Sequence, residues 1–249
     1  MTQLTQDQLT FFRTNSVLHL KSLFPKSLCE DARSYFLQKE SIIIEEYSEQ
    51  PRGLVTEKFD NNQFIKYFEF PIHFNSSLFG QFLTSGIFNI GSQLLESPVR
   101  YFSAEVHSRY SGATKIPIHQ DNAYYGLMGG QGLTFYIALD KQLPSSGGLQ
   151  YISNPVTDEF EHSPCDSSGF SLTIDQPILL NSRKLIQPVY DPGDCTIHHS
   201  RSVHFADCVP SGSDRSIVFR ISLFSEFETK KPGHDEWYQS IIMMNRAKR

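Results

Sequence analysis

The chain of 249 residues carries 22 Lys and Arg against 27 Asp and Glu, and 39% of its residues are hydrophobic, with 20 Phe, 11 Tyr and one Trp. This composition excludes a disordered chain and predicts one domain with an aromatic core. A formal charge of -5 without a dense Lys/Arg run argues against nucleic acid or an anionic membrane as partner.

The cysteines show neither a Cys-x-x-Cys pair nor the spacing of a small disulfide scaffold, so we expect free thiols. They are Cys29, Cys165, Cys195 and Cys208. No secretory leader is evident near the amino terminus, and no apolar run reaches the roughly 18 residues of a membrane span. Residues 245–249 are not a Ser-Lys-Leu peroxisomal address. These features predict a cytoplasmic location.

Residues 1–98 predict a mainly helical buttress. Thr5 and Gln8 form a capping box that starts a short helix, and a strand candidate follows at residues 16–20. A second helix is expected after Pro25. Its apolar face at i, i+4, i+7 and i+8 consists of Leu28, Ala32, Tyr35 and Phe36.

Three further segments of this buttress have distinct patterns. Residues 42–46 contain three consecutive isoleucines and read as a strand, whereas residues 47–62 are polar, contain Pro and Gly, and predict a loop at the mouth of a barrel. Residues 76–95 predict one or two helices.

From residue 99 the periodicity changes to two, which predicts the core of a barrel over about 99–225. One face of the first strand is polar, with Ser103, Glu105, His107 and Arg109. This row either lines a pocket or faces solvent, and the pattern alone leaves both readings open. The next long strand, residues 132–140, has an apolar face and a second face that carries Thr134, Tyr136 and Ala138. A closing helix is expected at about 233–246.

Two histidines and one carboxylate stand out as candidate metal ligands. His119 and Asp121 are two residues apart at the end of a strand, so both side chains can point the same way. His204 lies in a later Val/Ile-rich strand pattern that follows a glycine-led turn. Two histidines and one carboxylate form the facial triad that suits non-haem Fe(II) oxygenases. Arg215, eleven residues after His204, offers a guanidinium fork matched to a carboxylate.

The order of these motifs resembles the phytanoyl-CoA dioxygenase-like family. The resemblance includes the His-x-Asp pair, the segments at 132–140 and 147–154, the Gly193 turn, and the spacing of His204 to Arg215. It implies a mainly β fold with flanking α-helices, a double-stranded β-helix (a cupin-like jelly-roll barrel), as a single domain over residues 1–249. It also implies an enzyme that uses Fe(II), 2-oxoglutarate and dioxygen and releases succinate and carbon dioxide.

The resemblance implies roles for single residues. His119, Asp121 and His204 are expected to hold the iron and to form the catalytic centre, and Arg215 to anchor the distal carboxylate of 2-oxoglutarate. Tyr136 matches the position where relatives place an aromatic residue against this co-substrate. Thr134, on the same strand face, is a further candidate for binding it.

Several readings remain open at this point. Arg220 competes with Arg215 for the carboxylate, and His198 and His199 are interpreted as structural or pocket-lining. Because Asp121 is a carboxylate, halogenation, which in relatives needs a small residue there, is disfavoured. Candidates for substrate recognition are Glu105, His107, Arg109 and Tyr124, which suit a small polar or amino-bearing molecule. The favoured reaction is hydroxylation of an unactivated C–H bond of a small metabolite or natural-product intermediate. The alternatives are a cupin-like metal enzyme without 2-oxoglutarate and a non-catalytic binding member of the fold.

Overall fold

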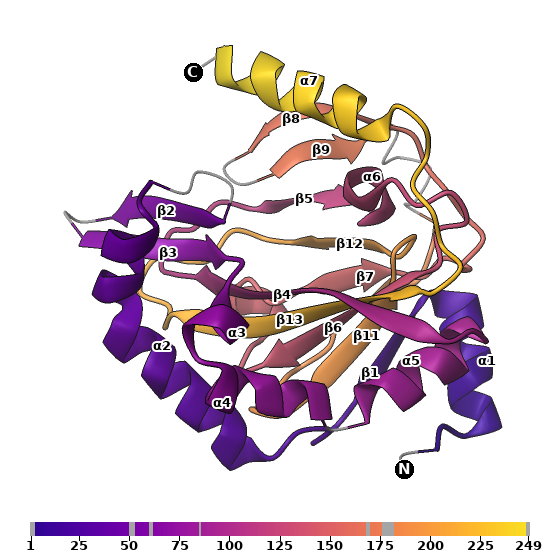
Figure 1. Ribbon diagram of the computed structural model, residues 1–249, viewed down its shortest axis with the longest axis horizontal. Coiled ribbons are helices and arrows are strands. Elements are labelled where there is room, and N and C mark those ends of the chain that lie inside the picture. Colours follow the sequence, from indigo (N-terminus) through magenta and orange to yellow (C-terminus); the bar gives the residue numbers. More distant parts are fainter. Residues whose placement is uncertain are drawn as a thin grey trace.

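The computed structural model, which describes residues 3–49, 53–59, 62–84, 86–167, 170–175 and 182–247, contains two antiparallel sheets that face each other (Figure 1). The major sheet has the order β1-β11-β6-β13-β4-β3-β2 and the minor sheet the order β10-β7-β12-β5. The predicted fold class, mainly β with flanking helices in a jelly-roll arrangement, is confirmed. The two sheets are open at their edges and do not form a closed barrel.

The strands of the major sheet are β1 (Val17–Leu20), β2 (Leu54–Phe59), β3 (Asn62–Phe68), β4 (Val99–Arg109), β6 (Gly132–Ala138), β11 (Cys195–His199) and β13 (Ser216–Ser225). Those of the minor sheet are β5 (Ile116–His119), β7 (Gln150–Ile152), β10 (Leu185–Ile186) and β12 (Val203–Ala206). A separate hairpin consists of β8 (His162–Ser167) and β9 (Phe170–Ile174).

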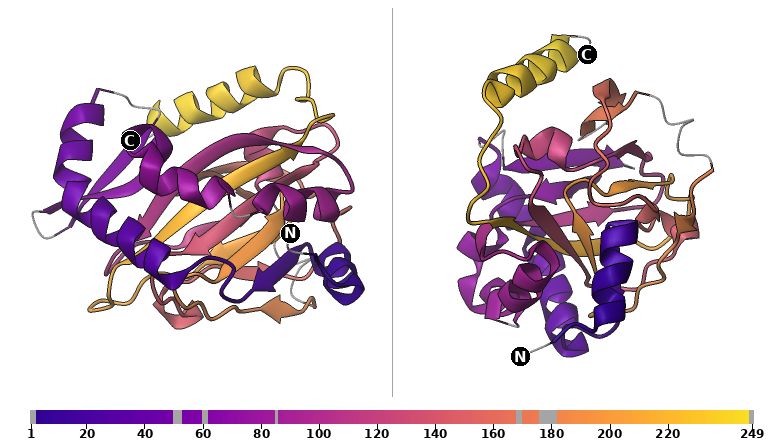
Figure 2. Two further views of the ribbon diagram at one scale, coloured as in Figure 1. Left: turned by 60° about the horizontal axis from the view of Figure 1, so that its bottom comes forward. Right: turned by 90° about the vertical axis from the view of Figure 1, so that its right-hand side faces the viewer.

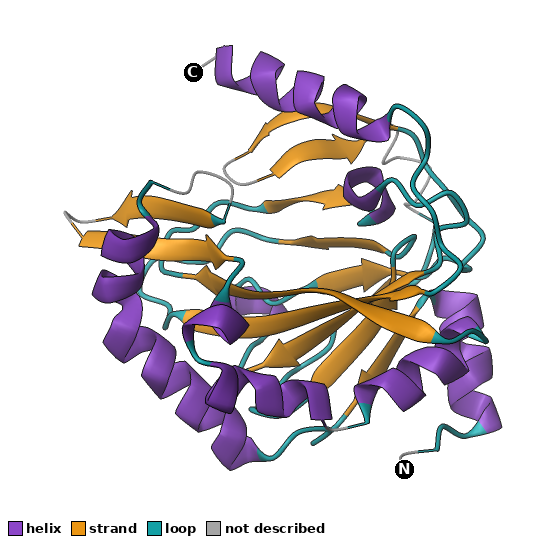
Figure 3. Ribbon diagram, in the orientation of Figure 1, coloured by secondary structure: helices purple, strands orange, loops and turns teal. Residues whose placement is uncertain are grey.

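Most helices lie on one side of the major sheet (Figures 2 and 3). They are α1 (Gln6–Asn15), α2 (Lys26–Tyr47), α3 (Pro71–Phe74), α4 (Ser76–Phe79), the 3-10 turn η1 (Gly80–Thr84) and α5 (Ile87–Leu95). At the other end of the molecule α7 (His234–Ala247) packs on the β8-β9 hairpin. Two short turns, α6 (Asn122–Tyr125) and η2 (Pro144–Ser146), lie in loops. No helix in the described part of the chain is long and apolar enough to cross a membrane.

The amino-terminal segment differs from the prediction in two places. Residues 42–46 do not form a strand but the last turns of α2, where Ile43 is buried in the same core as Phe36. Tertiary packing therefore outweighs the small intrinsic preference of isoleucine for strands. Part of the loop expected at 47–62 is strand β2, which pairs with β3. The segment also adds β1, β2 and β3 to the two edges of the major sheet.

The two faces of β13 meet different surroundings. Ile217, Phe219 and Ile221 belong to the core beneath the helices, where Phe219 contacts the rings of Phe79 and Phe82. The alternate residues of the strand face the other way, into the space between the two sheets. That space is lined by the smaller apolar cluster of Val17, Tyr136, Ala138, Leu149, Tyr151, Tyr190, Ala206 and Val218. The parity of a residue on β13 thus decides which of the two environments it enters.

The turn before β11 depends on a glycine. Gly193 has φ +94°, and a Cβ built there would lie 2.3 Å from the carbonyl oxygen of Phe24. The carboxylate of Asp194 then accepts hydrogen bonds from the backbone N–H groups of Ser22 and Asp191. This turn confirms the glycine-led turn expected at Gly193 and leads into β11.

His199, the last residue of β11, is almost fully buried against Phe12 of α1. Burial lowers the pKa of its imidazole from 6.5 to about 3. Between these values the unfolded chain binds a proton at this position that the folded chain does not, so stability falls as pH falls.

We therefore expect wild-type protein to lose stability between pH 6.5 and pH 4, and His199→Gln to lose less, by up to about 1.4 kcal/mol per pH unit. Urea unfolding followed by circular dichroism at several pH values measures the difference. Equal slopes for the two proteins would contradict a neutral buried His199.

Candidate metal centre

The three predicted ligands lie together on the side of the minor sheet that faces the major sheet. His119 ends β5, Asp121 follows it before α6, and His204 lies on β12, directly opposite His119 in the strand pairing. Asp121 Oδ1 is 3.6 Å from His119 Nε2 and 3.5 Å from His204 Nε2. All three side chains are buried, and their ligand atoms lie within 4.8 Å of one another. The structure thus brings together the residues that the sequence singled out.

Both imidazoles present the same nitrogen to this centre. His119 Nδ1 is 2.7 Å from the carbonyl oxygen of Pro117, and His204 Nδ1 is 2.9 Å from that of Ser202. A carbonyl only accepts, so each Nδ1 carries the proton and each Nε2 is left with a free lone pair. Burial lowers the pKa of both rings, which keeps them neutral. Neutral imidazoles held in this way are prepared to bind a metal.

The carboxylate of Asp121 is held through one oxygen only. Its Oδ2 accepts hydrogen bonds from Thr134 Oγ1 at 2.8 Å, Arg220 Nη2 at 3.0 Å and His198 Nε2 at 3.2 Å. Burial alone would raise the pKa of Asp121, but the charge of Arg220 and the surrounding imidazoles hold it well below its usual value. Asp121 is therefore ionised, and Oδ1 is the oxygen that faces the two histidines.

Each group that holds Asp121 is itself fixed. The hydroxyl of Tyr125 is 3.2 Å from Thr134 Oγ1 and 2.9 Å from Ser222 Oγ. His198 Nδ1 accepts from the hydroxyl of Tyr151 at 3.1 Å, which leaves Nε2 as the donor to Asp121. Three strands of the major sheet, β6, β11 and β13, therefore each supply a donor to Oδ2 of Asp121.

The polar row on β4 lies inside the molecule. Glu105 and Arg109 are both buried, so the solvent-facing reading of this row is wrong for these two residues. Glu105 Oε2 is 2.9 Å from His107 Nε2 and 3.5 Å from Arg220 Nη1. Burial would raise the pKa of Glu105, but Arg220 and His107 hold it below its usual value. Arg220 is thus shared between Glu105 and Asp121.

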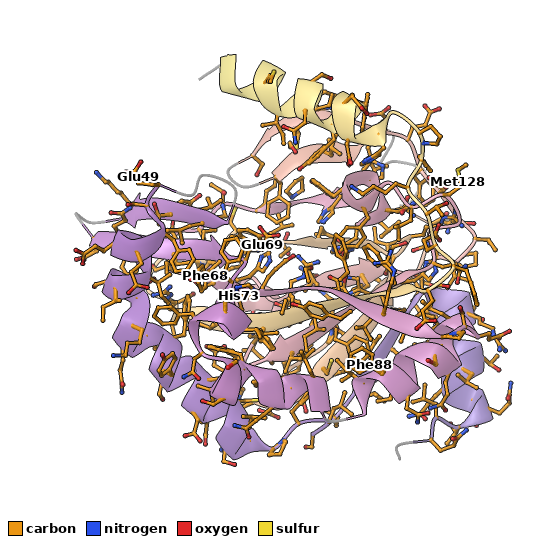
Figure 4. The ribbon with its side chains drawn as sticks, viewed as in Figure 1. Glu49, Phe68, Glu69, His73, Phe88 and Met128 are labelled. Atoms are coloured by element: carbon orange, nitrogen blue, oxygen red, sulfur yellow. The ribbon has the colours of Figure 1, made fainter. Side chains whose placement is uncertain are left out.

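Polar groups continue from this row to the end of β3. The ring of Tyr67 stands edge-on to His107 with centroids 5.0 Å apart. Glu69, which follows β3 and is labelled near the middle of Figure 4, is half-buried. Burial and the charge of Glu105 raise the pKa of the Glu69 carboxyl. Beside the candidate metal centre there is therefore a polar region with two carboxyl groups.

Tyr124 lies against the candidate centre from the opposite side. Its ring stands edge-on to that of His119 at 5.4 Å, and its hydroxyl donates to the carbonyl oxygen of Leu172. Phe170 of the β8-β9 hairpin also contacts the His119 ring at 5.4 Å. The hairpin therefore covers one side of His119.

The predicted co-substrate residues are placed differently from one another. Tyr136 is buried in the apolar cluster between the sheets and donates to Gln142 Oε1 at 2.8 Å. Thr134 holds Asp121, which the sequence pattern did not indicate.

Arg215 does not reach the triad. It forms a two-pronged ion pair with Glu40 of α2, with bonds of 2.6 and 2.7 Å, and it contacts the rings of Phe36 and Phe64. The physical reason is strand parity, because Arg215 falls on the same side as Ile217 and Phe219, beneath the helices. The residue that matches the spacing of the motif is therefore turned toward α2, whereas its competitor Arg220 faces the centre.

Sequence reasoning also left the contact of His198 with Asp121 unidentified. The signal was present in the alternation of β11 and β13, since Thr196 and His198 share one face, as do Arg220 and Ser222. Because alternate residues of a strand share one face, the position of one buried residue on each strand would have predicted which side chains face Asp121.

Comparisons with known proteins agree with this geometry. The model of the phytanoyl-CoA dioxygenase (PhyH) family matches residues 77–217, which is more than half of the chain and includes all three triad residues. The chain belongs to the phytanoyl-CoA dioxygenase family. A search of curated proteins finds no match.

Solved structures with a similar fold include three proteins of distant sequence. EvdO2 from Micromonospora carbonacea var. aurantiaca superposes with a TM-score of 0.71 at 15% identity, over 93% of this chain and 94% of its own. EctD from S. alaskensis gives 0.69 at 14% identity, over 89% and 76%. The non-haem alpha-ketoglutarate-dependent epimerase SnoN from nogalamycin biosynthesis gives 0.68 at 15% identity, over 91% and 85%. At these identities the likeness shows a shared fold.

The contacts of Asp121 lead to an expected order of effects on metal binding. Asp121→Ala removes a ligand and should abolish binding of one Fe(II) per chain. Thr134→Val removes one donor to Oδ2 and should weaken binding by about 10- to 100-fold. Anaerobic calorimetric titration with Fe(II) measures both.

Ser103→Ala, on the same polar row but outside the hydrogen bonds to Asp121, is the matched control and should bind as wild type does. Full binding by Asp121→Ala would contradict the metal centre. Unchanged binding by Thr134→Val would contradict the role of Oδ2.

Proposed function

We propose that this protein is an Fe(II)- and 2-oxoglutarate-dependent dioxygenase that hydroxylates an unactivated C–H bond of a small metabolite or natural-product intermediate, with release of succinate and carbon dioxide. The observation on which the proposal rests is the convergence of two neutral imidazole Nε2 atoms and one ionised carboxylate oxygen in a buried site. Family membership supports it independently.

The donor set fits Fe(II). Two histidines and one carboxylate on one side of a metal, with open positions on the other, are typical of non-haem Fe(II) oxygenases, whereas structural zinc sites favour a closed set of four ligands. His119, Asp121 and His204 would hold the ion. The bound iron, with 2-oxoglutarate and dioxygen, supplies the oxidising chemistry.

The surrounding residues would keep the donor set in its binding state. Arg220 compensates the negative charge of Asp121 and Glu105, so the carboxylates remain ionised inside the protein. The hydrogen bonds to Pro117 and Ser202 prevent either ligand ring from turning its protonated nitrogen inward. The apolar cluster between the sheets limits the access of water to this space, which strengthens each electrostatic contact within it.

The structural neighbours support the choice of co-substrate. EvdO2 has been crystallised with 2-oxoglutarate, and EctD with 2-oxoglutarate and 5-hydroxyectoine. SnoN is described as an epimerase and SnoK as a carbocyclase, both dependent on alpha-ketoglutarate. Enzymes of this fold therefore reach different products with one co-substrate, and hydroxylation is here the proposed outcome.

The polar region beside the centre suggests the kind of substrate. Glu105, His107 and Tyr67 face it, and Glu69 stands at its edge. Hydrogen-bond acceptors and carboxylates suit a small polar molecule that carries hydroxyl or amino groups. They oppose the phosphates of a coenzyme A thioester, for which a basic surface would be expected.

Anaerobic titration of the metal-free protein with Fe(II) and then 2-oxoglutarate tests the proposal first. We expect the weak visible charge-transfer band of an iron-2-oxoglutarate chelate. Admission of dioxygen together with candidate polar metabolites should then release succinate in proportion to hydroxylated product, as measured by mass spectrometry.

Iron binding without the visible band would favour a metal enzyme that does not use 2-oxoglutarate. Absence of iron binding would favour a non-catalytic binding protein. Succinate release with an epimerised or cyclised product would retain the cofactor assignment and replace hydroxylation.

A further inference from the structure

Arg109, the last residue of β4, is a buried cation that forms no ion pair with a carboxylate of the described residues. Its side chain is on the interior side of the sheet with Glu105 and His107, and the residue is only 9% exposed. Nη2 donates to the carbonyl oxygens of Thr114 at 2.8 Å and Asp207 at 2.7 Å. Nη1 is buried and has no acceptor among the described residues. A buried guanidinium normally has an anionic partner, because desolvation of the charge is otherwise uncompensated.

The backbone contacts of Arg109 locate it relative to the metal ligands. Thr114 precedes β5, which ends at His119, and Asp207 follows β12, which contains His204. The guanidinium therefore lies at the far end of both ligand strands. From His204 to Asp207 the chain advances by on the order of 10 Å. A five-carbon dicarboxylate that binds the metal at one end, together with the long arginine side chain, spans this separation.

Between these two points lies the apolar cluster between the sheets, which includes Tyr136, Tyr151 and Tyr190. Ala206, Val218 and Ala138 belong to the cluster there, together with Tyr136. Burial raises the pKa of the Tyr136 phenol, and the nearby charge of Arg109 opposes this effect. The hydroxyl of Tyr136 already donates to Gln142, so the N–H group without an acceptor among the described residues here is Nη1 of Arg109.

The two other arginines of this region are already paired. Arg215 is held by Glu40 on the helix-covered side of β13, and Arg220 by Glu105 and Asp121. Each would have to break an ion pair before it could bind another carboxylate. Arg109 would gain an ion pair and satisfy Nη1.

We propose that Arg109 binds the distal carboxylate of 2-oxoglutarate in place of Arg215. This inference rests on the proposed use of 2-oxoglutarate. The residue that binds this carboxylate then lies at the end of β4 and not at the start of β13. Arg215 is then a residue that fixes α2 to the major sheet.

The test compares three variants with two ligands. Arg109→Gln, Arg109→Lys and Arg215→Gln are loaded with Fe(II) without oxygen and titrated with 2-oxoglutarate and with 2-oxobutyrate, which lacks the distal carboxylate. The charge-transfer band gives each Kd. We expect Arg109→Gln to raise the Kd for 2-oxoglutarate about a hundredfold and Arg109→Lys about tenfold. Neither should change the Kd for 2-oxobutyrate.

Arg215→Gln is the matched control. It should lower Tm, because it breaks a largely buried ion pair, and leave both Kd values unchanged. Fe(II) affinity equal to that of wild type shows that a variant has kept its fold, and Arg109→Lys retains the buried charge if Arg109→Gln does not fold.

The possible failures are distinguishable. If wild-type protein binds Fe(II) but not 2-oxoglutarate, the proposed function fails. If wild-type protein binds 2-oxoglutarate and the Arg109 variants bind it equally well, this inference is overturned while the function stands. Selective loss of 2-oxoglutarate binding in Arg215→Gln would also overturn it and restore Arg215 as the clamp.

Discussion

The two oxygens of the Asp121 carboxylate have different surroundings, and the candidate centre depends on this difference. Oδ2 is occupied by donors from Thr134, His198 and Arg220, which come from three strands of the major sheet. Oδ1 faces His119 and His204, which belong to paired strands of the minor sheet. A metal bound here would therefore be held by the minor sheet and oriented by the major one. Any change in the spacing of the two sheets would change the donor set.

The buried charged residues along β4 differ in how they are paired. Near the centre, Glu105 and Asp121 share the positive charge of Arg220, so that side chain compensates charge rather than remaining free for a ligand. Four residues further along β4, Arg109 donates to two backbone carbonyls and to no carboxylate of the described residues. One strand thus carries Glu105, which shares Arg220 with Asp121, and a buried guanidinium whose Nη1 has no acceptor among the described residues. We interpret the region of Glu105 as the substrate side and Arg109 as the co-substrate side.

Much of this arrangement could be predicted from the sequence because it depends on local spacing. A ligand pair two residues apart, a third histidine in a later strand, and the alternation of β4 and β6 are visible in the pattern, and the resemblance to the family implied the jelly-roll class. The side of the sheet on which Arg215 lies could not be predicted from local spacing. Arg215 precedes β13, and its side chain pairs with Glu40, which is 175 residues away in the sequence. The isoleucines at the end of α2 were misread for a related reason, since long-range packing of Ile43 overrides its local preference.

The most direct test of this account is a crystal structure of the Fe(II)-loaded protein from crystals grown without oxygen. The iron is located by its anomalous scattering at the iron absorption edge. The account predicts one iron bound by His119 Nε2, His204 Nε2 and Asp121 Oδ1, with Oδ2 still in contact with Arg220, Thr134 and His198. Iron at another position, or Asp121 bound through both oxygens with Arg220 displaced, would contradict it.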